Sequence, residues 1–124
     1  MKYRSRSALF LLPLAFGPWA ARAQDPWPNH PVRLIIPFPP GGSTDSQGRL
    51  VGQHISQAMK VPVIVENRPG GGSFIGMSAC AKAAPDGYTL CSTTADSLTF
   101  SAFLYKNIPF DVENDFTGVT NLVT

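Results

Sequence analysis

The chain has 124 residues, a formal net charge of +2 and two cysteines, which is room for one domain. Four of its ten Lys and Arg residues lie within the first 23 positions, and all eight Asp and Glu residues follow them. Residues 24–124 therefore carry six basic and eight acidic residues, a net charge of −2. With no basic patch in that part, we expect no nucleic-acid partner.

Residues 1–23 have the three parts of a secretory signal peptide: a positive segment (2–6), an apolar segment (8–16) and an Ala-Arg-Ala cleavage signal (21–23). We expect cleavage after Ala23, export, and a domain spanning residues 24–124. The apolar segment is too short for a membrane span. A retained N-terminal anchor is the rival interpretation, which we do not favour.

The first predicted strand runs from Val32 to Phe38, an apolar run with little alternation, as is typical of a strand covered on both faces. A helix is predicted from about Asp45 to Met59. Its apolar stripe comprises Val51, Ile55, Ala58 and Met59, widened by Leu50. Gly48 and Gly52 weaken a helix by ~1 kcal/mol each relative to Ala, so we expect them to allow close packing against a sheet.

The loop between these elements carries the central hypothesis. Gly41 and Gly42 allow a sharp turn and a close approach of the backbone to a ligand. Thr44 and Gln47 have the spacing of a capping box, which predicts that the helix starts at Thr44. A helix N-terminus offers free N–H groups and partial positive charge. We therefore expect this loop to hold the carboxylate of a small organic acid.

The rest of the chain continues the alternation. It predicts a strand at Pro62–Val65, a helix with apolar positions from Ile75 to Ala83, and a strand at Tyr88–Cys91. Beyond these, a short helix is predicted at Leu98–Tyr105 and a further strand at Thr117–Val123. Strand–helix–strand–helix–strand order is typical of an α/β fold with a parallel sheet and flanking helices. The loops after the three strands then meet at one edge of the sheet, where such folds bind ligands.

Cys80 and Cys91 lie on either side of a Pro-Asp-Gly turn. In an oxidising compartment they are candidates for one disulfide, worth roughly 2–3 kcal/mol for so short a loop. The alternative, which we favour, is two small buried residues that happen to be cysteine. His30 and His54 show no ligand spacing with the cysteines, so we expect no metal site.

The sequence lacks the motifs of catalysis and nucleotide binding that its glycine-rich loops bring to mind. The first loop lacks the Gly-Lys-Ser/Thr ending of a phosphate-binding loop, and the glycines at 70, 72 and 76 lack the dinucleotide-binding spacing. There is no Gly-x-Ser-x-Gly nucleophile motif. Asp45 is explained as a first-turn acid and Asp86 as a turn residue, whereas Asp96 has no assigned role. We therefore expect no enzyme activity, no catalytic residue and no cofactor.

Several stretches together resemble the Bug-type receptors of tripartite tricarboxylate transporters, which are extracytoplasmic substrate-binding proteins. The first is Trp27-Pro28 with Pro31–Asp45, and the second is Val63–Gly70 followed by a glycine-rich helix start. The third is Ala81–Leu90, and smaller similarities lie at 104–106, 110–111 and 115–116. The resemblance covers almost everything after the signal peptide.

The resemblance implies a periplasmic binding protein of type II-like fold, with two α/β lobes around a cleft that holds a small carboxylate. It also implies membrane transporter subunits as partners. Carried onto this chain, the ligand-binding residues are Pro40, Gly41, Gly42, Ser43, Thr44 and Asp45 in the first loop, Gly71, Gly72 and Ser73 in the second, and Thr93, Thr94 and Ala95 in the third. Asp45 is expected to order its turn.

The chain also departs from the family. Many relatives carry Asn where Ser73 stands, and the two cysteines replace other small or apolar residues. The chain is shorter than a two-lobed receptor, so we expect an N-terminal fragment that forms an incomplete first lobe. A non-functional truncated remnant, and an exported α/β enzyme or nucleotide binder whose active part is missing, remain alternatives.

Overall fold

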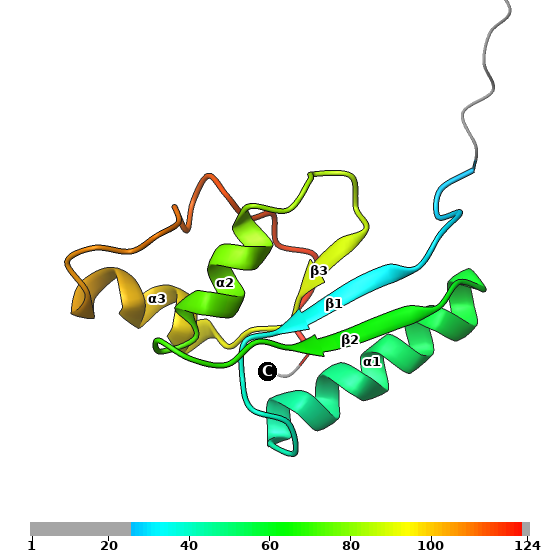
Figure 1. Cartoon of the computed structure of the whole chain (residues 1–124), viewed down its shortest axis with the longest axis horizontal. Coiled ribbons are helices and arrows are strands. Elements are labelled where there is room, and N and C mark those ends of the chain that lie inside the picture. Colours follow the sequence, from blue (N-terminus) through cyan, green and yellow to red (C-terminus); the bar gives the residue numbers. More distant parts are fainter. Residues whose placement is uncertain (1–25, 123–124) are drawn as a thin grey trace, which may run out of the picture.

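The computed structural model describes residues 26–122, without the side chains of residues 101 and 102. Figure 1 shows six elements in chain order: β1 (Val32–Ile36), α1 (Ser43–Met59), β2 (Val63–Asn67), α2 (Phe74–Ala81), β3 (Thr89–Cys91) and α3 (Ala95–Leu104). The predicted signal peptide lies outside the described residues. No helix in residues 26–122 is long and apolar enough to cross a membrane.

The three strands form one parallel sheet in the order β2-β1-β3. Leu34 of β1 lies beside Val65 on one side and Leu90 on the other. Strand β1 is central in the sheet and also contacts α1 and α2, so Leu34, Ile35 and Ile36 are buried. This burial explains the absence of alternation in the sequence of β1. The predicted α/β fold with a parallel sheet and flanking helices is confirmed.

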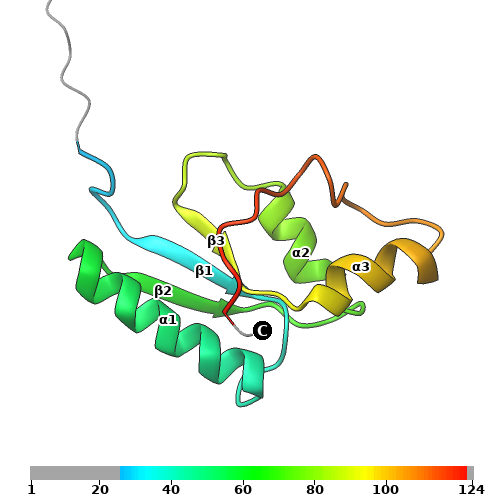
Figure 2. The same ribbon diagram turned by 180° about the vertical axis from the view of Figure 1, so that it is seen from behind.

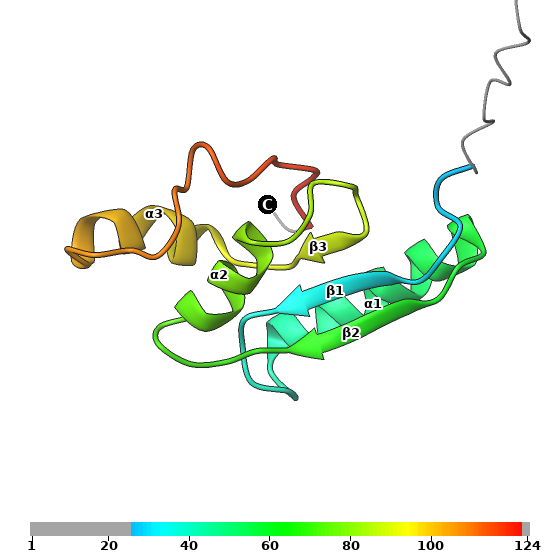
Figure 3. The same ribbon diagram turned by 45° about the horizontal axis from the view of Figure 1, so that its top comes forward.

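The first two helices cover opposite faces of the sheet (Figure 3). Leu34 and Ile36 point toward α1, where they face Gly52 and Gly48. Successive side chains of a strand alternate, so Ile35 points to the other face, where α2 lies. Seen from behind, the first turns of α1, α2 and α3 lie beyond the arrowheads of the strands, on the same side of the sheet's end (Figure 2).

Helix α1 packs on its glycines, as expected, but its predicted apolar stripe is partly wrong. A Cβ added to Gly48 would lie 2.6 Å from Ile36 Cδ1, which leaves room only for glycine unless Ile36 moves. Leu50 and Met59 are instead 56% and 40% exposed. Helix α1 approaches the sheet most closely at Gly48 and Gly52, which have no side chains. The face of α1 that touches the sheet is therefore not its most apolar face.

Several element boundaries and one element also differ from prediction. Strand β1 ends at Ile36 rather than Phe38, and α3 spans Ala95–Leu104 rather than Leu98–Tyr105. The capping box is absent: α1 begins at Ser43, Gly42 is the N-cap residue, and no side chain caps the helix. Strand β2 continues two residues beyond Val65, to Asn67. Residues 117–122, the described part of the predicted last strand, contain no strand. Val119, in the middle of this segment, is 80% exposed. The β-branched residues here therefore have no neighbouring strand to pack against among the described residues.

Candidate functional site

Three loops follow the carboxyl ends of the strands: the first loop (residues 37–42), the second (68–73) and the third (92–94). We call the edge that they share the loop edge. Backbone bonds tie the loops to the central strand there, since the Arg68 N–H donates to the Ile36 carbonyl at 2.8 Å and the Ser92 N–H donates to the Ile35 carbonyl at 2.9 Å. The parallel topology thus places the predicted ligand-binding loops at one edge.

The first loop is held by a buried carboxylate. Asp45, only 4% exposed, accepts the Gly41 N–H at 2.9 Å, the Arg49 Nε–H at 3.1 Å and the Asn67 Nδ2–H at 2.8 Å. Asn67 Nδ2 also donates to the Phe38 carbonyl, and Arg49 Nη2 donates to Asn67 Oδ1. We call Asp45, Arg49 and Asn67 the loop clamp, because they join both ends of the first loop to the end of β2.

The clamp stabilises the charged form of the carboxylate. The Arg49 hydrogen bond, followed by those from Gly41 and Asn67, lowers the pKa of Asp45 from its ordinary value of 3.8 to about 2. Asp45 therefore carries its negative charge at neutral pH and has no role as a proton carrier there. Its oxygens are spent on ordering the loop, as the sequence predicted.

Asp45 accepts the Gly41 N–H, and the backbone amides that follow Gly41 remain available to bind a ligand. Within residues 26–122, no hydrogen bond has the backbone N–H of Gly42, Ser43 or Thr44 as its donor; the first helical bond of α1 runs from the Ser46 N–H to the Gly42 carbonyl. Gly42 and Ser43 are exposed. These groups form a helix N-terminus in which the partial positive charge is open to a ligand.

The second loop is a left-handed turn. Gly71, Gly72 and Ser73 have φ values of 59°, 65° and 75°, which glycine adopts easily and serine does not. Its carbonyls receive the first amides of α2, and the Ser73 hydroxyl donates to the Gly72 carbonyl. The hydroxyl of Ser73 is therefore used within the protein, and the backbone is the part of this loop that can face a ligand.

The third loop holds an unsatisfied polar atom. Thr93 Oγ1 is buried and, among the residues that the structure describes, has no hydrogen-bond partner. Thr94 Oγ1 instead lies 3.1 Å from Ser97 Oγ, and Ala95 is the exposed first residue of α3. A buried hydroxyl without a partner is costly, so Thr93 is the residue in this loop that a polar ligand would satisfy.

Charge at the loop edge is already neutralised within the protein. Arg49 pairs with Asp45 at 3.1 Å, and Arg68 pairs with Glu66 at 2.7 Å. An anion at the loop edge would therefore be held by backbone dipoles and hydroxyls rather than by a dedicated cation.

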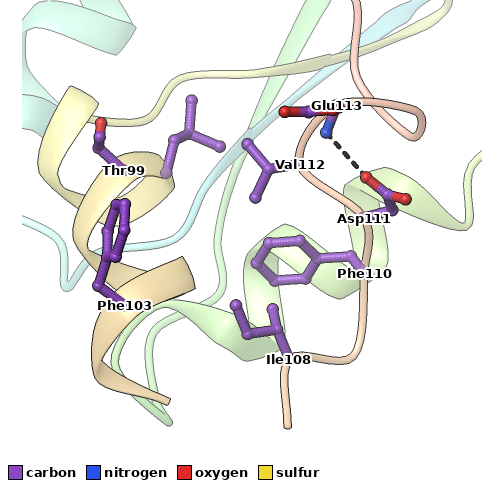
Figure 4. A pocket seen from close by; sticks show the side chains of 8 residues that line it. Thr99, Phe103, Ile108, Phe110, Asp111, Val112 and Glu113 are labelled. Atoms are coloured by element: carbon purple, nitrogen blue, oxygen red, sulfur yellow. Dashed lines mark hydrogen bonds between the residues drawn. The ribbon is translucent and has the colours of Figure 1, made fainter. Parts of the chain in front are cut away.

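A hollow of about 680 Å³ is lined by residues outside the three loops. It opens between α3 and residues 108–113, and Figure 4 shows Phe103, Ile108, Phe110 and Val112 around it, with Asp111 and Glu113 at one side. The Glu113 N–H donates to Asp111 Oδ1 at 2.9 Å. Apolar walls beside two carboxylates disfavour a carboxylate ligand, so we do not place the site here.

The structure gives a role to three residues for which the sequence predicted none: Arg49, Asn67 and Tyr105. Arg49 and Asn67 position the first loop, although they lie 18 residues apart in the chain. Tyr105 covers the second loop: a Cβ added to Gly72 would lie 3.3 Å from its hydroxyl oxygen, and its ring packs edge-on against Phe74. The only sequence signal for Asn67 was its place directly after a strand, at the predicted ligand edge.

Comparison with known proteins identifies the class. Residues 48–124 match the family described as the tripartite tricarboxylate transporter family receptor, and the chain belongs to this family. It is 41% identical over 97 residues to the Protein BugT of Bordetella pertussis, covering 77% of this chain and 30% of that protein. A protein from the ttuE-ttuC' intergenic region of Agrobacterium vitis is 40% identical over 115 residues, covering 93% of this chain and 33% of its own length.

Solved structures agree with this assignment. The periplasmic binding protein BugD superposes with a TM-score of 0.67 at 32% identity, covering 73% of this chain and 30% of that one. MatC of Rhodopseudomonas palustris with bound malate gives a TM-score of 0.70 at 30% identity, and the match covers 73% of this chain and 31% of MatC. An R. palustris protein with adipate gives a TM-score of 0.67 at 31% identity, and the match covers 70% of this chain and 29% of that protein. This chain therefore spans about a third of the length of these relatives.

Proposed function

We propose that this chain carries the first ligand-gripping surface of an extracytoplasmic receptor for a small organic carboxylate. The observation that carries the proposal is the first loop. Its shape is fixed by the loop clamp, whereas the N–H groups of Gly42, Ser43 and Thr44 have no acceptor among residues 26–122. A carboxylate has two oxygens that accept such donors without needing a cation.

The second and third loops complete the proposed grip. The backbone of Gly71 and Gly72 is exposed, and the unsatisfied Thr93 Oγ1 provides a hydroxyl. Relatives of similar fold have malate and adipate in their solved structures, and both are dicarboxylates. We therefore propose a ligand of this class for this chain.

Export and delivery form the second part of the proposal. Residues 1–23 would be removed as a signal peptide after Ala23, and residues 24–124 would act as a first lobe in the periplasm. The ligand would pass to the membrane subunits of a tripartite tricarboxylate-type transporter. The family is one of receptors, and BugD is described as a periplasmic binding protein, which supports this assignment over an enzyme.

The affinity expected of this chain is low. Three or four hydrogen bonds at about 0.5–1.5 kcal/mol net each amount to about 2–6 kcal/mol, which corresponds to dissociation constants from about tens of micromolar to about tens of millimolar. Micromolar binding needs about 8 kcal/mol, and therefore more contacts than one open loop edge offers.

Substitution of Gly42 tests the site without disturbing the fold. Gly42 has a φ of −81°, and a Cβ there would meet only the Pro39 carbonyl oxygen, at 3.8 Å. Gly42→Val should therefore melt within a few degrees of the wild type, while its side chain crowds the free amides. We expect the melting temperature of the full chain to rise with malate or adipate in wild type and not in Gly42→Val.

Gly118→Val is the matched control, since a Cβ at Gly118 meets no atom within 4 Å and lies outside the three loops. It should keep the ligand-induced rise. An equal rise in Gly42→Val and in wild type would show that the carboxylate binds elsewhere and would refute the assignment of the first loop.

A further inference from the structure

The two cysteines of the chain meet where α2 packs on β3. Cys80 lies near the end of α2 and Cys91 is the last residue of β3, and both are half-buried free thiols. Cys91 Sγ is 3.9 Å from Met77 Sδ on α2, and Cys80 lies three residues after Met77, on the same side of that helix. The chain has no other cysteine, so each thiol has one possible intramolecular partner.

The surroundings give the two thiols different chemistry. The hydrogen bond from Cys91, together with the positive charge of Arg33, lowers the pKa of Cys80. The same hydrogen bond, followed by burial, raises the pKa of Cys91. The thiolate is the reactive form of cysteine. We therefore expect Cys80 to attack an oxidant first and Cys91 to attack Cys80 in a second step.

We propose that Cys80 and Cys91 form an intramolecular disulfide that fastens α2 to β3 when the chain meets a disulfide oxidant. The inference rests on the proposed function for its setting, because an exported chain meets thiol–disulfide exchange proteins in an oxidising compartment. The two thiols lie on elements that already contact each other, so the bond would join neighbouring parts of the fold.

The reaction balances as two exchange steps. The Cys80 thiolate attacks one sulfur of the oxidant disulfide, forms a mixed disulfide and releases one oxidant thiolate. Cys91 then loses its proton and attacks Cys80 Sγ, which forms the Cys80–Cys91 bond and releases the second thiolate. The protein loses two protons and two electrons, and the oxidant disulfide becomes two thiols.

The bond would act on the loop edge through α2. This helix begins directly after Gly71, Gly72 and Ser73, and β3 ends directly before the third loop. Fastening α2 to β3 therefore fixes the second loop relative to Thr93 and Thr94. Because the closed segment is short and contains the Pro85-Asp86-Gly87 turn, the bond also restricts the unfolded chain.

The test uses the purified full chain, incubated with glutathione disulfide and then treated with an alkylating agent before its intact mass is measured. We expect a mass lower by two hydrogens and no alkylation, and two alkylated thiols after reduction. Two glutathione adducts, or two alkylated thiols after full incubation, would overturn the proposal. Cys80→Ser and Cys91→Ser are the controls, and each should stop at one glutathione adduct.

A second readout tests the fastening itself. The oxidised wild type should melt about 10–20 °C above the reduced form, whereas neither serine variant should show a redox-dependent shift of this size. An oxidised chain that melts at the temperature of the reduced chain would overturn the proposed fastening. Malate or adipate binding is measured on the reduced chain, so failure of the disulfide and failure of the receptor function remain distinguishable.

Discussion

Asp45 shows how one buried residue orders the loop that we propose binds the ligand. Its carboxylate binds the Gly41 N–H, Arg49 and Asn67, and so it determines which amides of the first loop are left free. The sequence indicated an acid in the first helical turn and an ordering role for it. The partners of Asp45 could not be predicted, because Asn67 lies 22 residues away and meets it only once β2 pairs with β1.

The clamp predicts an acid-sensitive contribution to stability. The pKa of Asp45 falls from 3.8 to about 2 on folding, so below pH 4 the unfolded state binds a proton that the folded state lacks. The stability provided by ionised Asp45 is complete well above pH 4 and is lost as the pH falls toward 2. In Asp45→Asn that contribution is absent at every pH.

Urea unfolding of the full chain between pH 2 and pH 6 measures this effect. The stability gap between wild type and Asp45→Asn should be widest at pH 6 and should close as the pH approaches 2. The carboxyl of Asp111, whose pKa is also lowered, chiefly by the Asn114 side chain, is common to both proteins and cancels in the comparison. A gap that stays constant across this range would contradict the account of the clamp.

Capping shows where residue-level prediction failed. Thr44 and Gln47 have the spacing of a capping box, yet Gly42 occupies the N-cap position without a side-chain bond. Asp45 reaches back four residues to the Gly41 N–H instead. A spacing rule identifies groups able to cap, but a buried carboxylate with three donors is more stable than a lone hydroxyl contact, and so it decides where the helix begins.

At the scale of elements, glycine positions set how closely helices approach the sheet. A Cβ added to Gly76 of α2 would lie 2.6 Å from Pro37 Cβ and 2.8 Å from the Arg68 carbonyl oxygen. These atoms belong to the starts of the first and second loops. Helix α2 therefore rests directly on both loops, and glycine is the residue that allows this.

Gly76→Ala should destabilise the chain by about 1–3 kcal/mol, because backbone atoms cannot move aside as a side chain can. Chemical denaturation measures the change. Gly118→Ala, where a Cβ meets no atom within 4 Å, should differ from wild type by less than about 0.5 kcal/mol. Equal stability of Gly76→Ala and Gly118→Ala would show that α2 does not rest on the loops as described.

Elements marked by an apolar run or a turn signal were predictable, whereas the strand expected at 117–123 was not found in its described part. The apolar run of β1 and the turn signal before β3 indicated a parallel α/β order that the structure confirms. The pattern at 117–122 suggested a strand, but these residues have no partner strand within the described part of the chain. A strand is stable only against a neighbour, which local sequence does not specify.

At the scale of the whole molecule, topology brings distant loops to one edge. The parallel order β2-β1-β3 places residues 37–42, 68–73 and 92–94 after neighbouring strand ends, and this much followed from the alternation of elements. The side-chain details did not follow from it. Neither the use of Ser73 within its own loop nor the cover of Gly72 by Tyr105 has a signal in the sequence.

The central claim is that the loop edge, and not the hollow beside α3, holds a small carboxylate. Amide NMR of the full chain during titration with malate or adipate, up to tens of millimolar, tests it most directly. We predict that the amide signals of Gly42, Ser43 and Thr44 shift most, with smaller shifts at Gly71, Gly72 and Thr93, and none at residues 108–113. Shifts confined to residues 108–113, or no shift anywhere, would contradict the account.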